Sequence, residues 1–218
     1  MKKVLILVEG LTEETVVRDL IDPHLWEREI CLEPVILKTK REKSGKTFKG
    51  GIGSFEQVSR DLKLLLGDTS AIAVTTLLDY YRLPSDFPGT DDRPTRDPYK
   101  RVAHVERAFE KAIDHRKFVP HLTLHELEAW VYVDPFLSEW VFGDPKISKK
   151  LIEIRNQCGG PELVDEGPAT APSKRILAVA PEYEKPFHGP LAIGEVGIDR
   201  VRAACTHANA WLAKLESL

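Results

Sequence analysis

The stretch VLILVEGLTEE (residues 4–14) joins a predicted strand to a predicted helix through a short turn. Its continuous apolar run, residues 4–8, is typical of a strand that is buried on both faces of a parallel sheet. Glu9 ends this run, and an amphipathic segment follows at residues 12–21, with Thr12 as the expected N-cap. The pattern therefore predicts a strand-turn-helix unit that carries a carboxylate where the strand ends.

The same alternation continues along the chain. Three further apolar runs predict strands at residues 34–38, 71–81 and 118–124. Apolar residues at helical spacing predict helices at 54–66, where Ser54 and Gln57 have capping-box spacing, and at 99–113. Strands that alternate with helices are typical of an open α/β sheet, most of whose strands are parallel.

Composition predicts one globular domain. The chain has 218 residues, of which 42% are hydrophobic, and this is enough for one sizeable core. We expect a single domain over residues 1–218, with an α/β core at 1–133 and a mostly helical extension at 134–218. The formal net charge of −3 disfavours a protein that coats nucleic acid along its whole surface.

Cysteine content and hydropathy predict the cellular compartment. Three widely separated cysteines, Cys31, Cys158 and Cys205, match neither a disulfide framework nor a paired-cysteine metal site. The apolar run at the N-terminus is too short for a signal peptide, and no stretch is long enough to span a membrane. We therefore expect a cytoplasmic protein that does not interact with membranes.

Carboxylates follow several of the predicted strands. Glu9 follows the first strand, Asp79 ends the third, and Glu126 and Glu128 follow the fourth. The carboxyl ends of parallel strands meet at one edge of a sheet, which is where ligands bind in open α/β folds. Clustered carboxylates repel each other unless a cation offsets the repulsion, and Mg²⁺ or Mn²⁺ are the hard ions that prefer oxygen ligands. The sequence therefore predicts a metal site suited to phosphodiester cleavage.

Several motifs along almost the whole chain resemble a known bacterial family. VEGLTEE, TTLLDYYRLPSDFPG, LHELEAWVYVDP, APSKRI and CTHANAWLAKL occur in the order typical of the family called domain of unknown function 4276. That family is regarded as TOPRIM-like and related to the nuclease domains of OLD (overcoming lysogenization defect) proteins. The resemblance implies a metal-dependent nuclease or phosphohydrolase, in phage defence beside a partner ATPase of the AAA or ABC type.

The resemblance assigns roles to two of the strand-end acids. Glu9 matches the TOPRIM glutamate, which acts as a metal ligand or general acid/base, and Asp79 matches the first aspartate of the TOPRIM D-x-D pair. Tyr81 stands where the second aspartate belongs, so the sequence departs from the pattern there. Either Asp86 or a later glutamate takes its place, or the site binds a single metal ion.

The remaining site residues lie further along the chain. The segment HELEAW resembles the F-E-x-W segment of the related nucleases, which favours Glu128 as a ligand and leaves Glu126 as the second choice. If a helix starts here, the two side chains point about 200° apart and only one of them reaches the metal. Lys174 is expected to neutralise phosphate charge in the transition state.

A basic, glycine-rich loop follows the second predicted strand. Its cations are Lys40, Arg41, Lys43, Lys46 and Lys49. Such an arm is suited to the phosphate backbone of DNA or RNA, in which case binding weakens steeply with salt. Nothing in the loop predicts recognition of particular bases.

Three functions remain open at this point. The first is a metal-dependent phosphodiesterase or nuclease. The second is a non-catalytic TOPRIM-like partner or sensor subunit of an ATPase complex, which the missing second aspartate favours. The third is hydrolysis of a small phosphorylated nucleotide by the same acids.

Overall fold

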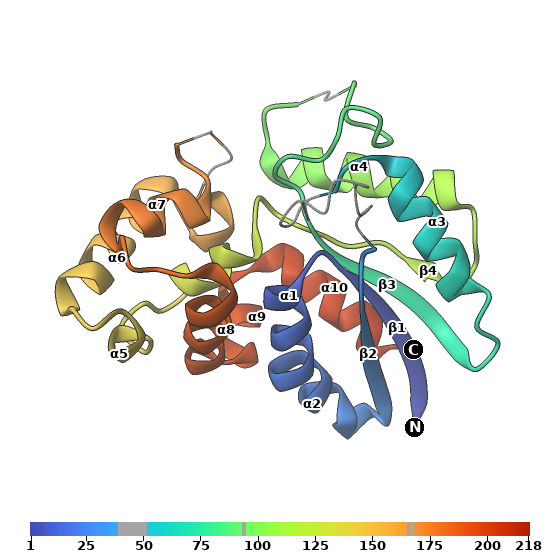
Figure 1. Ribbon diagram of the computed structural model, residues 1–218, viewed down its shortest axis with the longest axis horizontal. Helices are drawn as coiled ribbons and strands as arrows, with labels where there is room; N and C mark the ends of the chain where they lie inside the picture. The colour runs from blue at the N-terminus through green and yellow to red at the C-terminus, as the bar shows by residue number, and fades with distance from the viewer. Residues whose placement is uncertain (39–51, 93–94, 165–166, 168) are drawn as a thin grey trace, which may run out of the picture.

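The protein has an open parallel β-sheet with helices on both faces (Figure 1). The computed structural model describes residues 1–38, 52–92, 95–164, 167 and 169–218. In that part of the chain five strands pair in the order β2-β1-β3-β4, with β5 also pairing with β3, and every pairing is parallel. The strands are β1 (Lys2–Val8), β2 (Ile30–Ile36), β3 (Ala71–Asp79), β4 (Phe118–Val119) and β5 (Leu122–Thr123). The predicted α/β class is confirmed.

Strand β1 lies between two hydrophobic cores. Its side chains alternate between the faces of the sheet, as strand geometry requires. Val4, Ile6 and Val8 point into one core, whereas Leu5 and Leu7 point into the other. This burial on both faces explains why the strand is a continuous apolar run.

Two sets of helices cover these faces. The core around Leu5 and Leu7 is closed by α3 (Phe55–Leu66) and α4 (Pro98–Ile113). The opposite core is closed by α1 (Leu11–Val16), a π-helical turn (Val17–Ile21), α2 (Asp22–Leu25) and helices from the C-terminal part of the chain. A 3₁₀ turn (Trp26–Arg28) then leads into β2.

The chain after the last strand is helical, as predicted. It begins with a buried 3₁₀ segment (Leu127–Tyr132) and continues through α5 (Glu139–Phe142), α6 (Pro145–Cys158), a 3₁₀ turn (Pro161–Leu163), α7 (Pro172–Val179), α8 (Lys185–Val196), α9 (Ile198–Ala204) and α10 (Thr206–Glu216). Helices α5 to α7 lie to one side of the sheet, whereas α10 packs against it (Figure 1). Trp211 of α10 donates a hydrogen bond from Nε1 to Oγ1 of Thr75 at 2.9 Å. The division at residue 133 stays a prediction, and side chains from both of its parts share one core.

All four predicted strands have different boundaries in the structure, and the second and fourth differ most. Strand β2 begins at Ile30, four residues before the predicted start, and contains Pro34. Proline is tolerated there because β2 is an edge strand. The predicted strand at 118–124 is split into β4 and β5. Between them, the hydroxyl of Thr76 accepts a hydrogen bond from the amide of His121 and donates one to its carbonyl, which replaces the sheet ladder at this point.

The starts of two helices test the capping predictions. Thr12 was wrongly predicted as an N-cap, because α1 begins at Leu11 directly after Gly10, and Thr12 is buried. Gly10 is itself the N-cap residue and has an extended backbone, so the helix starts two residues earlier than a Thr12 cap would allow. Ser54 is confirmed as the N-cap of α3, since its hydroxyl accepts a hydrogen bond from the amide of Gln57. Across the described residues, every helix is too short or too polar to cross a membrane.

Candidate active site

The candidate site lies where the direction of strand connection reverses. From β1 the chain moves to β2 on one side and then to β3 on the other, so the carboxyl ends of β1 and β3 lie side by side. Glu9 directly follows β1, and Asp79 is the last residue of β3. This arrangement is the switch point at which open α/β sheets bind ligands.

A cavity of about 340 Å³ opens at this point. Acidic and basic side chains share its wall almost equally, which suits a ligand carrying both anionic groups and a bound cation. The lining residues are Glu9, Ile52, Asp79, Tyr81, Arg82, Glu126, Ser173, Lys174 and Lys185.

Lys185 lies at the centre of the acids. It is the first residue of α8, and its Nζ lies 3.0 Å from Oε2 of Glu128, 3.2 Å from Oδ2 of Asp79 and 3.5 Å from Oε1 of Glu13. A lysine at a helix N-terminus is unfavourable for the helix dipole. The three surrounding carboxylates offset that cost, because their negative charges attract the Lys185 ammonium group and keep it in place.

Two of these carboxylates are almost completely buried. Glu128 has 0% of its surface exposed and Glu13 has 3%. Within the described residues, Oε2 of Glu128 and Oε1 of Glu13 pair with Lys185 and have no other partner, and Oε1 of Glu128 accepts no hydrogen bond. Each oxygen of a buried carboxylate ordinarily accepts hydrogen bonds on its lone pairs. The oxygens of Glu128 and Oε1 of Glu13 therefore have lone pairs left for a further ligand.

Backbone amides orient two of the acids, Asp79 and Glu126. Oδ1 of Asp79 accepts a hydrogen bond from the amide of Leu127 at 2.9 Å, which leaves Oδ2 directed at Lys185. Oε2 of Glu126 accepts a hydrogen bond from the amide of Ser173 at 2.8 Å, in the first turn of α7. These bonds hold the two carboxylates in fixed directions before any ligand binds.

The backbone beside the cavity adopts uncommon conformations. His125, directly before Glu126, has a φ of +65°, and Arg82 has a φ of +63°. Residues other than glycine rarely adopt a backbone conformation with positive φ, because it costs roughly 1 kcal/mol or more for each residue. The amide of Tyr81 donates a 2.7 Å hydrogen bond to the carbonyl of His125, which joins the two segments. Such strain is concentrated at functional sites in proteins.

Burial and like charge shift the ionisation of the acids. Burial, together with the charges of Asp79 and Glu13, raises the pKa of Glu9 to about 8. Burial raises the pKa of Glu128 to about 8 even though the Lys185 charge lowers it. Although burial acts in the opposite direction, the surrounding carboxylates raise the pKa of Lys185 well above its ordinary value. Lys185 is therefore a permanent cation, while two of the acids carry protons near neutral pH.

The donor set fits a hard divalent cation only if Lys185 moves. Mg²⁺ binds oxygen ligands at about 2.1 Å, which is closer than the 3.0 to 3.5 Å between Nζ and the carboxylate oxygens. Within the described residues, the group whose ligand atoms all lie within 4.8 Å of one another is at a different place, on Glu106, His121 and His207. The ammonium group of Lys185 lies among the acids at the ends of the strands. The oxygens of Glu13 and Glu128 that pair with it have no other partner within the described residues, so they could bind a metal ion once Lys185 moves.

The structure brings together five of the six predicted catalytic and metal-binding residues. Glu9, Asp79, Glu126 and Lys174 line the cavity, and Glu128 reaches it through Lys185. Both glutamates of HELEAW lie at the site because Glu126 is an extended residue before the 3₁₀ segment, so helical spacing does not separate them.

Other predicted residues lie elsewhere. Asp86 is exposed, does not line the cavity, and accepts a hydrogen bond from the amide of Phe55 at the start of α3. Tyr81, at the position of the missing aspartate, lines the cavity. The predicted nucleic-acid contacts lie outside the described residues, and they are Lys40, Arg41, Lys43, Lys46 and Lys49.

Sequence reasoning missed several residues of the site. Glu13 lies in the first turn of α1, where an acid is favourable for the helix dipole alone, and nothing in the sequence distinguishes it from its neighbour Glu14. Lys185 is 106 residues from Asp79 in the sequence and has no motif around it. Arg82 and Ser173 were also missed, although they lie within the motifs TTLLDYYRLPSDFPG and APSKRI, next to Tyr81 and Lys174 respectively.

Comparisons with known proteins give one family and one structural neighbour. The fold is similar to that of the C-terminal region of the Burkholderia pseudomallei OLD protein, with a TM-score of 0.47, 16% sequence identity and 99% of each chain covered. No curated protein matches the sequence. The family model described as domain of unknown function (DUF4276) matches residues 8–216, which is almost the whole chain. The chain therefore belongs to the family DUF4276.

Proposed function

We propose that this protein is a metal-dependent phosphodiesterase of the TOPRIM type that acts on nucleic acid. The observation that carries the proposal is a group of five carboxylates at the switch point of the sheet, three of which pair with Lys185 while two line the cavity beside it. They are Glu9, Glu13, Asp79, Glu126 and Glu128. Acids gathered at this point are costly for a fold and are typical of a site that binds cations.

Mg²⁺ or Mn²⁺ would be held by Asp79, Glu128 and Glu13, with Glu9 at the edge of the cavity. When bound, such an ion supplies Lewis-acid activation of water and of a phosphate oxygen. The residues of the chain do the rest. Asp79 is pre-oriented by the amide of Leu127, and the buried oxygens of Glu13 and Glu128 that pair with Lys185 accept no other hydrogen bond within the described residues.

Glu9 has the properties of a general acid/base. Its pKa of about 8 is close to neutral pH, where a group can both accept and donate a proton at a useful rate. Glu9 also lines the open cavity, unlike Glu128, so a water molecule or a leaving oxygen can reach its carboxylate. We assign proton transfer to Glu9 for these two reasons.

Three cations in the cavity wall suit a phosphate group. Arg82 and Lys174 are exposed at the opening, and Lys185 lies deeper. The developing negative charge of a phosphodiester transition state is stabilised by positioned cations of this kind. Displacement of Lys185 from the acids would leave its ammonium group free to pair with phosphate.

The test is cleavage of single- and double-stranded DNA and of RNA by purified protein with Mg²⁺ or Mn²⁺. Glu9→Gln should lower the rate by at least about 100-fold, as expected when a general acid/base is lost. Asp92→Asn is the matched control, because Asp92 is an exposed carboxylate that is absent from the cavity wall. Cleavage that survives Glu9→Gln at the wild-type rate would contradict the assignment. Turnover of mononucleotides alone would indicate a small-molecule phosphohydrolase instead.

A second candidate is a non-catalytic subunit that associates with an AAA or ABC-type ATPase in phage defence. Two observations favour it: Tyr81 occupies the position of the second TOPRIM aspartate, and Lys185 already balances the acids without a metal ion. This candidate predicts that Asp79→Asn leaves partner binding unchanged. The enzyme predicts that the same variant loses both Mn²⁺ binding and cleavage.

A further inference from the structure

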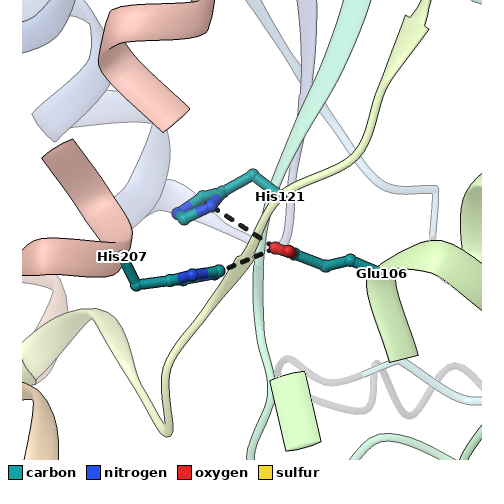
Figure 2. A group of neighbouring side chains, drawn as sticks. All are labelled: Glu106, His121 and His207. Carbon is teal, nitrogen blue, oxygen red and sulfur yellow. Dashed lines mark hydrogen bonds and ion pairs between the residues drawn. The ribbon is translucent and has the colours of Figure 1, made fainter. Parts of the chain in front are cut away.

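A second group of potential metal ligands lies outside the acid site. Glu106 of α4, His121 between β4 and β5, and His207 of α10 converge from three separate elements (Figure 2). Oε1 of Glu106 lies 3.0 Å from Nε2 of His207 and 3.6 Å from Nδ1 of His121. One ligand atom from each residue lies within 4.8 Å of the other two, and none of the three residues lines the acidic cavity.

His121 is fixed in place and is not satisfied by the protein. Its side chain is 1% exposed and stacks on the indole of Trp211, with ring centroids 4.3 Å apart and 5° between the planes. Within the described residues its Nε2 has no hydrogen-bond partner, and Nδ1 is too far from Glu106 for a good hydrogen bond. Burial lowers the pKa of His121 well below its ordinary value, so the ring is a neutral imidazole. An unsatisfied neutral imidazole in the core has a spare lone pair for a metal ion.

Backbone hydrogen bonds hold the other two ligands in position. Oε1 of Glu106 accepts a hydrogen bond from the amide of Leu122 at 2.8 Å. The two oxygens of Glu162 accept hydrogen bonds from the amides of His207 and Ala208, which fixes the first turn of α10. Both ligands are therefore placed by the fold itself, as pre-organised metal sites require.

The donor types select the ion. Two imidazoles and one carboxylate suit Zn²⁺ and similar transition metals, whereas Mg²⁺ prefers a shell of oxygen atoms. The side chains of Glu106 and His207 are each 14% exposed, so an ion can enter from solvent and keep a water molecule as a fourth ligand. We propose that Glu106, His121 and His207 form a Zn²⁺ site that ties α4 and α10 to the sheet and is separate from the acid site.

The test is metal binding by untagged protein that has first been stripped with a chelator. We expect saturable binding of one Zn²⁺ in isothermal titration, and visible absorption of bound Co²⁺ typical of a four-coordinate nitrogen and oxygen site. His207→Gln and Glu106→Gln should each weaken Zn²⁺ binding by at least about 100-fold, because each removes a direct ligand where loss of outer-shell partners alone costs 10- to 100-fold. His115→Gln is the control, since His115 is an exposed histidine outside the group.

Two further results separate this site from the strand-end acids and from a folding defect. Asp79→Asn should leave Zn²⁺ binding unchanged, and Zn²⁺ should raise the melting temperature of the wild type but not of folded His207→Gln. His121 is left unaltered because its burial makes loss of folding a trivial outcome. Absence of saturable Zn²⁺ binding by the folded wild type, or binding that is insensitive to both ligand variants, overturns the proposal and leaves the group as a hydrogen-bonded cluster.

Discussion

The ammonium group of Lys185 lies 3.0 Å from Oε2 of Glu128, a carboxylate with no surface exposed to solvent. Lys185 comes from α8 and Glu128 from the 3₁₀ segment after β5, and they meet at the cavity beside the switch point of the sheet. Burial disfavours the charged form of Glu128, and the nearby Lys185 charge favours it. Lys185 therefore does in the metal-free protein what a divalent ion would do in the metal-bound protein.

Lys185→Met should destabilise the metal-free protein by on the order of 3 kcal/mol, because it leaves the buried Asp79 carboxylate, whose Oδ2 lies 3.2 Å from Nζ, without a counter-charge. Mn²⁺ should then stabilise this variant more than it stabilises the wild type, since the ion takes over the missing charge. Urea unfolding with and without Mn²⁺ measures both effects. Lys174→Met is the control for stability, because Lys174 is exposed. Equal stabilisation of variant and wild type by Mn²⁺ would disprove replacement of one cation by the other.

Affinity for Mg²⁺ should rise with pH between about 6 and 9. The pKa values of Glu9 and Glu128 are about 8, so both carboxyls are mostly protonated at pH 7 and must release protons when an ion binds. Titration calorimetry in buffers of different ionisation enthalpy measures that release directly. Affinity that stays constant over this range would place the ion away from these two acids.

Glu9→Gln should change how stability depends on pH. The folded protein holds the Glu9 proton with a pKa of about 8, against 4.5 for the unfolded chain. The stabilisation that follows is complete below pH 4.5 and is lost as pH rises through about 8, with a slope of at most about 1.4 kcal/mol per pH unit. Glutamine cannot ionise, so the variant should become more stable relative to the wild type as pH rises from 5 to 9. Thermal unfolding over that range, without metal, is the measurement.

Replacement of Lys40, Arg41 and Lys43 by serine should weaken binding to nucleic acid and make it less dependent on salt. Each cation that contacts a phosphate contributes about 0.9 to the slope of log affinity against log salt on duplex DNA. Fluorescence anisotropy with labelled duplex at several salt concentrations gives that slope. Lys146, Lys149 and Lys150 are exposed on α6 and serve as a control triplet. An unchanged slope would show that this loop does not track the phosphate backbone.

Ser54→Ala should destabilise the protein by about 1 kcal/mol, because it removes the side-chain N-cap of α3. Ser85→Ala is the matched control, since Ser85 is exposed and caps no helix in the described structure. Chemical denaturation of both variants provides the comparison. A difference near zero between them would mean that water replaces the capping bond without cost.

Local patterns in the sequence determined the class of fold and four of the five acids of the site. The apolar runs of β1 and β3 are so continuous that they can only be buried on both faces of a sheet, and each ends at a carboxylate, Glu9 or Asp79. Local pattern failed where a tertiary contact replaced a local one. Strand β2 extends to Ile30 because an edge strand tolerates Pro34, and the hydroxyl of Thr76 replaces the ladder between β4 and β5.

What only the tertiary structure decided is which distant side chains meet. Lys185 reaches Asp79 across 106 residues, and His207 reaches Glu106 across 101. No periodicity or motif encodes such contacts, because they depend on how α8 and α10 pack on the sheet rather than on neighbours in the chain. Glu13 was visible as an acid in a first helical turn, and only the packing of α1 against α8 turned it towards a lysine. The sequence alone thus determined that acids gather at the carboxyl ends of the strands. The packing of the helices decided that Lys185 is the cation that pairs with them.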